Sequence, residues 1–314
     1  MIESRKNFAI VCDSACDLPL SVLERAGVAL VPLKVRIADE TYRDCIDIDA
    51  PDYFVSFSSR TGQVNTYSPS VEELADVYKS LVSQGYTQIV SVHVSSEMRD
   101  AYQNAVAAAH ETKGARIQVM DTRGTSGKFA LVLARLACDR DAGFGVDECV
   151  ARAVRVAQES RMLVIPSAAA RPDHGIGHRS RGILGHVTSL QRRALGIRGV
   201  FEINGEGQAN ELFRSSELSR LSGFMARTMS AYAQKMGPVI YVEVSGGVPK
   251  FLSVVEKPLD TNEFESDCAA VLDTNPTTTS QLGVGAVGLA YVPQSLLDPA
   301  EAASFFQVDE ALDS

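Results

Sequence analysis

The sequence lacks the features of several protein classes. Its most apolar helical stretch, "FALVLARLAC", is interrupted by Arg135 and is too short to span a bilayer, which takes about 20 residues. The opening segment, "MIESRKNF", lacks the apolar core and small-residue cleavage site of a secretory signal. Lysine and arginine total 30 against 39 acidic residues, and this charge of −9, with no basic stripe, disfavours binding to nucleic acid phosphates. We expect a cytoplasmic protein without a membrane segment or a nucleic acid partner.

The cysteines lack the C-x-x-C spacing of metal and redox motifs. They are Cys12, Cys16, Cys45, Cys138, Cys149 and Cys268. Two of them fall in apolar stretches, so we expect most to be reduced and packed thiols.

Two glycine-rich motifs are present but lack the context that nucleotide binding needs. "GVGAVG", residues 283–288, has the dinucleotide spacing, yet a polar run precedes it and a β-rich run follows where a helix is required. "TRGTSGKF" resembles a phosphate-binding loop, but Thr122 stands at the first glycine position and Phe129 at the magnesium-binding Ser/Thr position. We therefore predict neither a dinucleotide site nor an ATP site, and no cofactor.

A metal site and a catalytic group have little support in the sequence. His174 and His178 have helical spacing for two ligands, but Gly175 and Gly177 argue against a helix and no third ligand follows. No G-x-S-x-G motif occurs, and none of the five histidines has a convincing nucleophile partner. We predict no metal site and no catalytic residue.

Three segments of the first half share one pattern: a short β-rich apolar run, a polar turn and a helical stretch. They are "FAIVCDSACDLPLSVLERAG", "QIVSVHVSSEMRDAYQNAVAAAHE" and "RIQVMDTRGTSGKFALVLARLACDR". Repeated units of this kind predict a parallel sheet covered by helices. The pattern changes after "VDECVARAVRVAQESR". We therefore predict an α/β protein of two domains: residues 1–161 with a parallel α/β/α sheet, and residues 162–314 as a second α/β domain.

Elements of the second half are less regular. "MLVIP", "PVIYVEV" and "GAVGLAYVP" are typical of strands, and "SELSRLSGFMARTMSAYAQKMG" is typical of a long helix. In the stretch 245–279, "VPKFLSVVEKPL" fits either a strand or a helix.

The polar turns place hydroxyls and acids where a parallel sheet binds its ligands, outside the carboxyl ends of its strands. They carry Asp13 and Ser14, Ser95 and Ser96, and Asp121 and Thr122. The same residue types are also preferred as helix N-caps. A binding site and helix capping both remain open explanations for any one turn.

Several segments together resemble the DegV family. They are "IVCDSACDLP", "GVALVPLKVRI", "YRDCIDI", "GYTQIVSVHVSSEMRDAYQNA" and "IQVMDT", with weaker similarity in "LGIRGVFEINGEG" and "QLGVGAVGLAYV". Members of that family are two-domain α/β proteins that hold a long-chain fatty acid between their domains, and some present its carboxylate to a separate fatty acid kinase. The resemblance implies a fatty acid ligand in an interdomain cleft, a kinase as a partner, and no catalysis by this chain.

The resemblance also assigns ligand-binding roles. The family's carboxylate-binding threonine corresponds to Thr66 in "TYSP", and its paired serines correspond to Ser95 and Ser96. Gln281 falls where the family has a histidine near the head group. Ser14 and Gly285 complete the predicted set. A carboxylate needs charge-assisted hydrogen bonds when buried, and we expect hydroxyls and the free N–H groups of a helix beginning at Ser96 to supply them.

Several positions depart from the family pattern. The family's S-S-G-L-S-G-T is "SSEMRDA" here, which places Glu97 in the first turn of the expected anion-binding helix and Arg99 close by. Glu97 would repel a carboxylate unless Arg99 screens it. Arg214 falls near a basic position that family members use toward the kinase; a solvated cation is the competing interpretation.

One further hypothesis belongs to a different functional class. Asp13, Asp121 and the loop with His174 and His178 would act as an enzyme site for a small phosphorylated or carboxylated substrate. Because no nucleophile–base pair supports it, we rank this hypothesis second.

Overall fold

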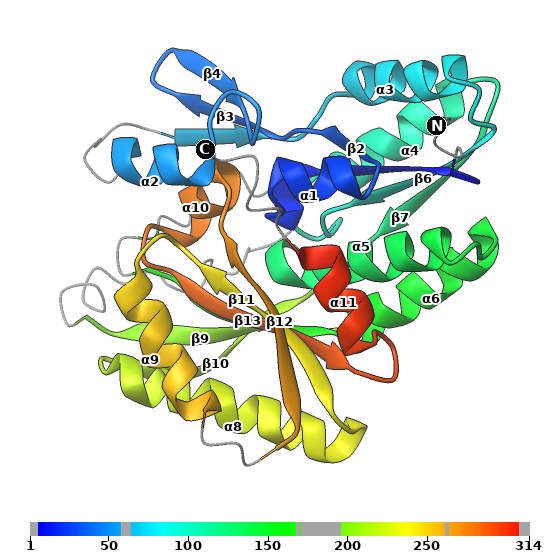
Figure 1. The fold of residues 1–314 in the computed structure, drawn as a ribbon. Helices are drawn as coiled ribbons and strands as arrows, with labels where there is room; N and C mark the ends of the chain where they lie inside the picture. Colours follow the sequence, from blue (N-terminus) through cyan, green and yellow to red (C-terminus); the bar gives the residue numbers. More distant parts are fainter. Residues whose placement is uncertain (1–5, 58–63, 168–169, 171–195, 261–263, 308–314) are drawn as a thin grey trace.

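The structure is a computed structural model that describes residues 6–57, 64–167, 170, 196–260 and 264–307 (Figure 1). His174 and His178 lie outside these ranges.

The first sheet is parallel and has the strand order β2-β1-β6-β7. Its strands are β1 Ala9–Asp13, β2 Val28–Val31, β6 Gln88–His93 and β7 Arg116–Asp121. The helices that follow them are α1 Leu20–Arg25, α3 Val71–Ser83, α4 Ala101–Glu111, α5 Ser126–Asp141 and α6 Val146–Glu159. The predicted strand–turn–helix units are confirmed. Ser70 starts α3 with a capping box, in which its side chain and that of Glu73 bond each other's backbone N–H.

A small antiparallel sheet of order β4-β3-β5 is inserted between β2 and α3. Its elements are β3 Lys34–Ile37, β4 Glu40–Arg43, α2 Ala50–Phe57 and β5 Val64–Tyr67. β3 and β4 are joined by a tight turn, in which Ala38 adopts a φ of 52°. This small sheet carries Thr66, which is the only buried residue of β5.

The second sheet has the order β10-β9-β8-β13-β11-β12, in which only the β11–β12 pair is parallel. Its strands are β8 Arg161–Ile165, β9 Arg198–Ile203, β10 Ala209–Ser215, β11 Val239–Ser245, β12 Ser266–Asp273 and β13 Val287–Pro293. The helices are α8 Leu218–Met236, α9 Pro249–Leu259, α10 Pro276–Leu282 and α11 Pro299–Phe306. The ambiguous stretch around Val254 is therefore helical.

The sheets and helices form alternating layers (Figure 1). α3 and α4 cover one face of the first sheet, and α8 and α9 cover one face of the second. Helices α5, α6 and α11 lie between the sheets and share one hydrophobic cluster with both. Side chains alternate along β1 accordingly: Val11 faces α3 and α4, whereas Ile10 faces the middle layer.

The predicted division at residues 161 and 162 coincides with the start of β8, the first strand of the second sheet. The middle helices, which precede this point, pack on both sheets. The division into two domains stays a prediction.

Gly127 tests the contact between α5 and the second sheet. A Cβ atom on Gly127 would lie 2.7 Å from Val242 Cγ2 and 2.9 Å from Ala290 Cβ. On Gly223 of α8, the nearest atom would be the mobile Arg227 Nη1 at 3.4 Å. We expect Gly127→Ala to lower the free energy of unfolding by about 1–3 kcal/mol through overpacking. Gly223→Ala, its control, should raise it by about 0.5–1 kcal/mol through helix propensity.

Urea denaturation of both variants measures this difference. If Gly127→Ala is as stable as Gly223→Ala, α5 does not pack against the second sheet as closely as described.

Candidate functional site

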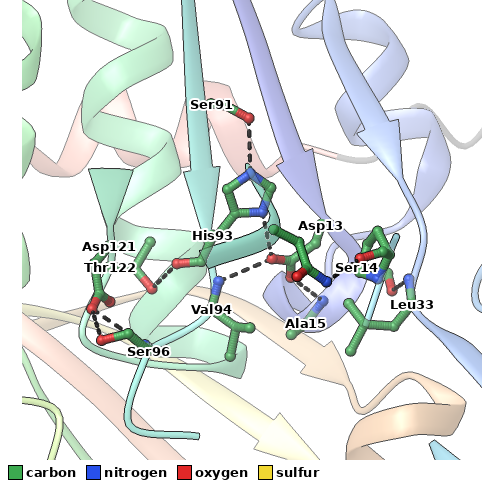
Figure 2. Close-up of polar contacts among 12 residues, drawn as sticks. Asp13, Ser14, Ala15, Leu33, Ser91, His93, Val94, Ser96, Asp121 and Thr122 are labelled. Carbon is green, nitrogen blue, oxygen red and sulfur yellow. Dashed lines mark hydrogen bonds and ion pairs between the residues drawn. The ribbon is translucent and has the colours of Figure 1, made fainter. Parts of the chain in front are cut away.

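A buried chain of hydrogen bonds ends on Asp13, at the carboxyl end of β1 (Figure 2). Tyr78 of α3 donates to Ser91 Oγ at 2.8 Å, Ser91 Oγ lies 2.8 Å from His93 Nε2, and His93 Nδ1 lies 3.0 Å from Asp13 Oδ2. All four residues are buried. A neutral His93 with its proton on Nδ1 satisfies every donor and acceptor in this chain, because Ser91 then donates to Nε2.

Backbone groups hold the remaining acceptor positions of Asp13. Ala15 N donates to Oδ1 and Val94 N donates to Oδ2, each at 3.0 Å. Three donors therefore converge on this carboxyl group and occupy both of its oxygens. His93 was missed by the sequence reasoning, although Ser91 and His93 are polar at alternate positions of β6, in which they follow the apolar Ile89 and Val90.

Two further buried carboxylates attach α10 to the first half of the chain. Asp44, which directly follows β4, accepts hydrogen bonds from Ser14 Oγ at 2.8 Å and from the Thr277 backbone N at 3.2 Å and hydroxyl. Asp17 accepts from Asn275 N at 3.0 Å and Thr278 Oγ1 at 2.8 Å. Asn275 is the N-cap of α10, so both carboxylates also lie at the positive end of that helix.

These bonds explain two of the polar residues at the end of β1. Ser14 was predicted to bind ligand, but its Oγ donates to Asp44 and accepts from Leu33 N at 3.0 Å. Asp17 accepts its hydrogen bonds from the start of α10. The Ser14 hydroxyl is therefore used both as a donor and as an acceptor within the protein.

The expected helix start at Ser96 is wrong. Residues 96–98 form a turn, and α4 begins at Ala101. Met98 N and Arg99 N donate to the Ser95 carbonyl at 2.9 and 3.1 Å. These two N–H groups are therefore already used within the turn and are not available to bind an anion. Ser96 N donates to Asp121 at 3.2 Å, and the Ser96 hydroxyl donates to the same oxygen at 2.5 Å. Ser96 thus joins the ends of β6 and β7.

The turn also overturns the expectation for Glu97. Its side chain is exposed, whereas Arg99, two residues on, is only 6% exposed. Arg99 Nη1 donates to Thr66 Oγ1 at 3.1 Å. This bond connects the turn after β6 with β5 of the small sheet, and so places Thr66 beside the edge that carries Ser95.

Thr66 and Ser95 share a property that Ser14 and Ser96 lack. Thr66 Oγ1 accepts from Arg99, and Ser95 Oγ accepts from Glu97 N at 3.3 Å. Within the described ranges, neither hydroxyl proton has an acceptor.

Gln281 of α10 adds a third donor of the same kind. Its Nε2 is buried and has no partner among the residues that the structure places. Gly285 differs, since its N–H donates to Gly246 O at 2.8 Å and its φ is 86°. Three predicted ligand-binding residues therefore keep an unused donor, and Gly285 has a role in the turn before β13.

The tip of the β9–β10 hairpin covers Ser95. A Cβ atom on Gly207 would lie 2.7 Å from Ser95 Oγ, and Gly207 has a φ of 83°. Glycine is needed here both for the positive φ and for the close approach. The backbone carbonyl of Asn204 accepts a hydrogen bond from Gly207 N at 3.1 Å and so closes the hairpin tip.

The rejected nucleotide motifs adopt structures unlike nucleotide sites. Lys128 is buried and its Nζ donates to the Ala157 carbonyl at 2.6 Å. The glycine-rich run 283–288 leads into strand β13, as the sequence predicts. Across the described part of the chain, no three His, Cys, Asp or Glu side chains are grouped to hold a metal ion. No described helix is long and apolar enough to cross a membrane.

A model of the DegV family, described as an uncharacterised protein, matches residues 7–294. A DegV domain-containing protein of Staphylococcus aureus is 23% identical over 282 residues, which are 89% of this chain and 96% of that protein. One of Streptomyces coelicolor is 28% identical over 201 residues, 64% of this chain and 68% of that protein.

Solved structures share the fold. A fatty-acid-binding DegV family protein of Thermus thermophilus superposes with a TM-score of 0.77 at 20% identity, covering 91% of this chain and 99% of its own. A stearic acid-binding protein of Eubacterium ventriosum superposes with a TM-score of 0.78 at 22% identity, and the match covers 91% of this chain and 98% of that protein.

The attachment of α10 predicts a pH dependence of stability. Burial raises the pKa of Asp17 to about 8 and that of Asp44 to about 6, above the roughly 3.9 of an unfolded chain. The folded protein then binds more protons than the unfolded chain, so the free energy of unfolding falls as the pH rises from about 4 to 8. Asp17→Asn keeps an acceptor oxygen but cannot ionise. In the Asp17→Asn variant, the free energy of unfolding should fall less steeply with pH than in the wild type, by up to about 1.4 kcal/mol per pH unit.

Urea denaturation across this pH range gives the slopes, with the exposed Asp76→Asn as the control for removal of one carboxylate. Identical slopes for the wild type and Asp17→Asn would contradict the prediction.

Proposed function

This chain belongs to the DegV family, and from that membership we propose that it binds a long-chain fatty acid between its two halves, with the carboxylate at Thr66 and Ser95. Structurally similar proteins support the choice of ligand: one is described as binding stearic acid and another as loaded with heptadecanoic acid.

One observation carries the head-group assignment. Thr66 and Ser95 are buried, each already accepts an N–H, and each keeps a hydroxyl proton without an acceptor among the described residues. A buried donor without a partner is unfavourable, and a carboxylate oxygen would accept such a proton in a strong charge-assisted bond. Gln281 Nε2 offers a further donor.

The acyl chain would supply most of the affinity. At about 0.8 kcal/mol per buried CH₂, a sixteen-carbon chain gains roughly 11 kcal/mol before ordering costs. The head group then sets the orientation of the ligand.

The proposed role is that of a carrier without catalysis of its own, which presents the carboxylate to a separate fatty acid kinase. All six cysteines are free thiols, which fits the cytoplasm. The competing enzyme hypothesis has weaker support, because both of its acids already accept hydrogen bonds within the protein. Asp13 is bonded to His93, and Asp121 accepts from the Ser96 hydroxyl and from the Arg123 backbone N–H at 2.7 Å.

Head-group variants test the assignment. Ser95→Ala and Thr66→Val each remove one charge-assisted hydrogen bond, worth about 1.5–3 kcal/mol, and should weaken palmitate binding about ten- to hundredfold. Ser96→Ala is the matched control, because the neighbouring hydroxyl already donates to Asp121. Titration of delipidated protein measures the affinities. Unchanged affinity in both variants would remove the head-group assignment, and no palmitate binding by the wild type would remove the carrier function.

Arg214 tests the proposed kinase contact. It is paired with Glu211 on the exposed strand β10. If it contacts a kinase, Arg214→Ala should slow acyl-phosphate formation by a cognate fatty acid kinase without changing palmitate affinity. Exposed Arg220→Ala on α8 is the control. An unchanged rate would assign Arg214 to its pair with Glu211 alone.

A further inference from the structure

Arg99 is an unusual residue for the interior of the site. A guanidinium stays charged and is rarely buried without compensation. Here the side chain reaches from the Ser95–Arg99 turn to Thr66, so its head lies against one of the two hydroxyls assigned to the carboxylate. The other hydroxyl, that of Ser95, belongs to the residue whose carbonyl accepts Arg99 N.

We propose that Arg99 is the principal receptor of the ligand's carboxylate, so that the site takes an ionised acid through a guanidinium–carboxylate pair and discriminates against uncharged lipids. This inference rests on the proposed fatty acid binding and specifies which lipids the site accepts. In this arrangement Thr66 accepts from Nη1 and turns its own proton to the same carboxylate. Ser95 and Gln281 serve as neutral donors around it.

Surrounding acids keep the guanidinium charged. Burial lowers the pKa of Arg99 to about 10, while the charges of Asp13 and Asp44 act in the opposite direction, so Arg99 is a cation at neutral pH. Each of the two acids is also held by its own donors: Asp13 by His93 and two backbone N–H groups, and Asp44 by Ser14 and Thr277.

The chemistry of the pair explains the expected selectivity. A guanidinium presents five N–H donors in a planar fork that matches the two oxygens of a carboxylate. Hydroxyls alone also bond alcohols and esters. A fatty alcohol of equal length would bury the same acyl surface but would lose the charge-assisted part of the interaction. The ratio of acid affinity to alcohol affinity therefore isolates the contribution of Arg99.

The experiment compares palmitate with hexadecanol on delipidated wild type, Arg99→Met and Glu97→Gln. Arg99→Met keeps an unbranched apolar stem but removes the charged guanidinium, and should weaken palmitate binding about ten- to hundredfold while hexadecanol affinity stays within about twofold. Glu97→Gln, the control, changes one charge in the same turn on an exposed side chain and should leave both affinities unchanged. If Arg99→Met binds palmitate as tightly as the wild type, or loses both lipids equally, Arg99 supports the fold and the proposal fails.

A second measurement needs only the wild type, in case Arg99→Met does not fold. Palmitate with a ¹³C-labelled carboxyl reports its own ionisation by NMR as the pH is lowered. A carboxylate paired with a guanidinium should stay ionised below the pKa of about 4–5 that an unperturbed aliphatic carboxylic acid has, whereas burial among hydroxyls alone would raise that pKa. Asp13 on β1 and Asp44 after β4 are the acids that act on Arg99, and the label distinguishes the ligand from both. A bound carboxyl that titrates above its unperturbed value overturns the proposal.

The two proposals fail in different ways. If the wild type binds hexadecanol and palmitate equally, lipid binding stands and the carboxylate receptor does not. If it binds neither, the fatty acid function itself is wrong.

Discussion

The hydrogen bonds of Asp44 and Asp17 to the start of α10 hold the two halves of this protein together at the candidate site. Both carboxylates come from the first half, and their partners Asn275, Thr277 and Thr278 lie more than 200 positions later in the chain. Removing one partner from such a buried set leaves a buried polar group without its hydrogen bond, which costs more than the net gain from forming that bond. The positions of Thr66, Ser95 and Gln281 relative to one another therefore depend on these contacts.

Within that frame, the polar residues divide into two groups by how their hydrogens are used. Ser14, Ser96 and Thr122 donate to protein acceptors, and so they shape the ends of the strands. The hydroxyls of Thr66 and Ser95 accept hydrogen bonds from the protein, and their own protons have no acceptor among the residues that the structure describes. The sequence cannot reveal this difference, because the residue types are the same and only the partners differ.

The elements that the sequence predicted best are those with a buried, continuous apolar pattern, such as β1, β6 and α5. β10 and β12 were not predicted, because both are edge strands with half-exposed side chains and lack an apolar run. The prediction for the turn before α4 was correct in position, but the N–H groups of the turn bond to the protein: Met98 N and Arg99 N to the Ser95 carbonyl, and Ser96 N to Asp121. The pair Arg99–Thr66 joins residues 33 positions apart and required three-dimensional structure to find.

The position of β13 constrains how the chain can assemble as it leaves the ribosome. Strand β13 pairs with β8 on one side and β11 on the other, so the second sheet has no continuous centre until residues 287–293 have been synthesised. Until then, the faces of α5 and α6 that pack on that sheet have no partner layer. The middle helices are therefore covered on this side only after β13 has been synthesised, and a nascent chain stalled before β13 would expose that apolar surface to chaperones and to aggregation.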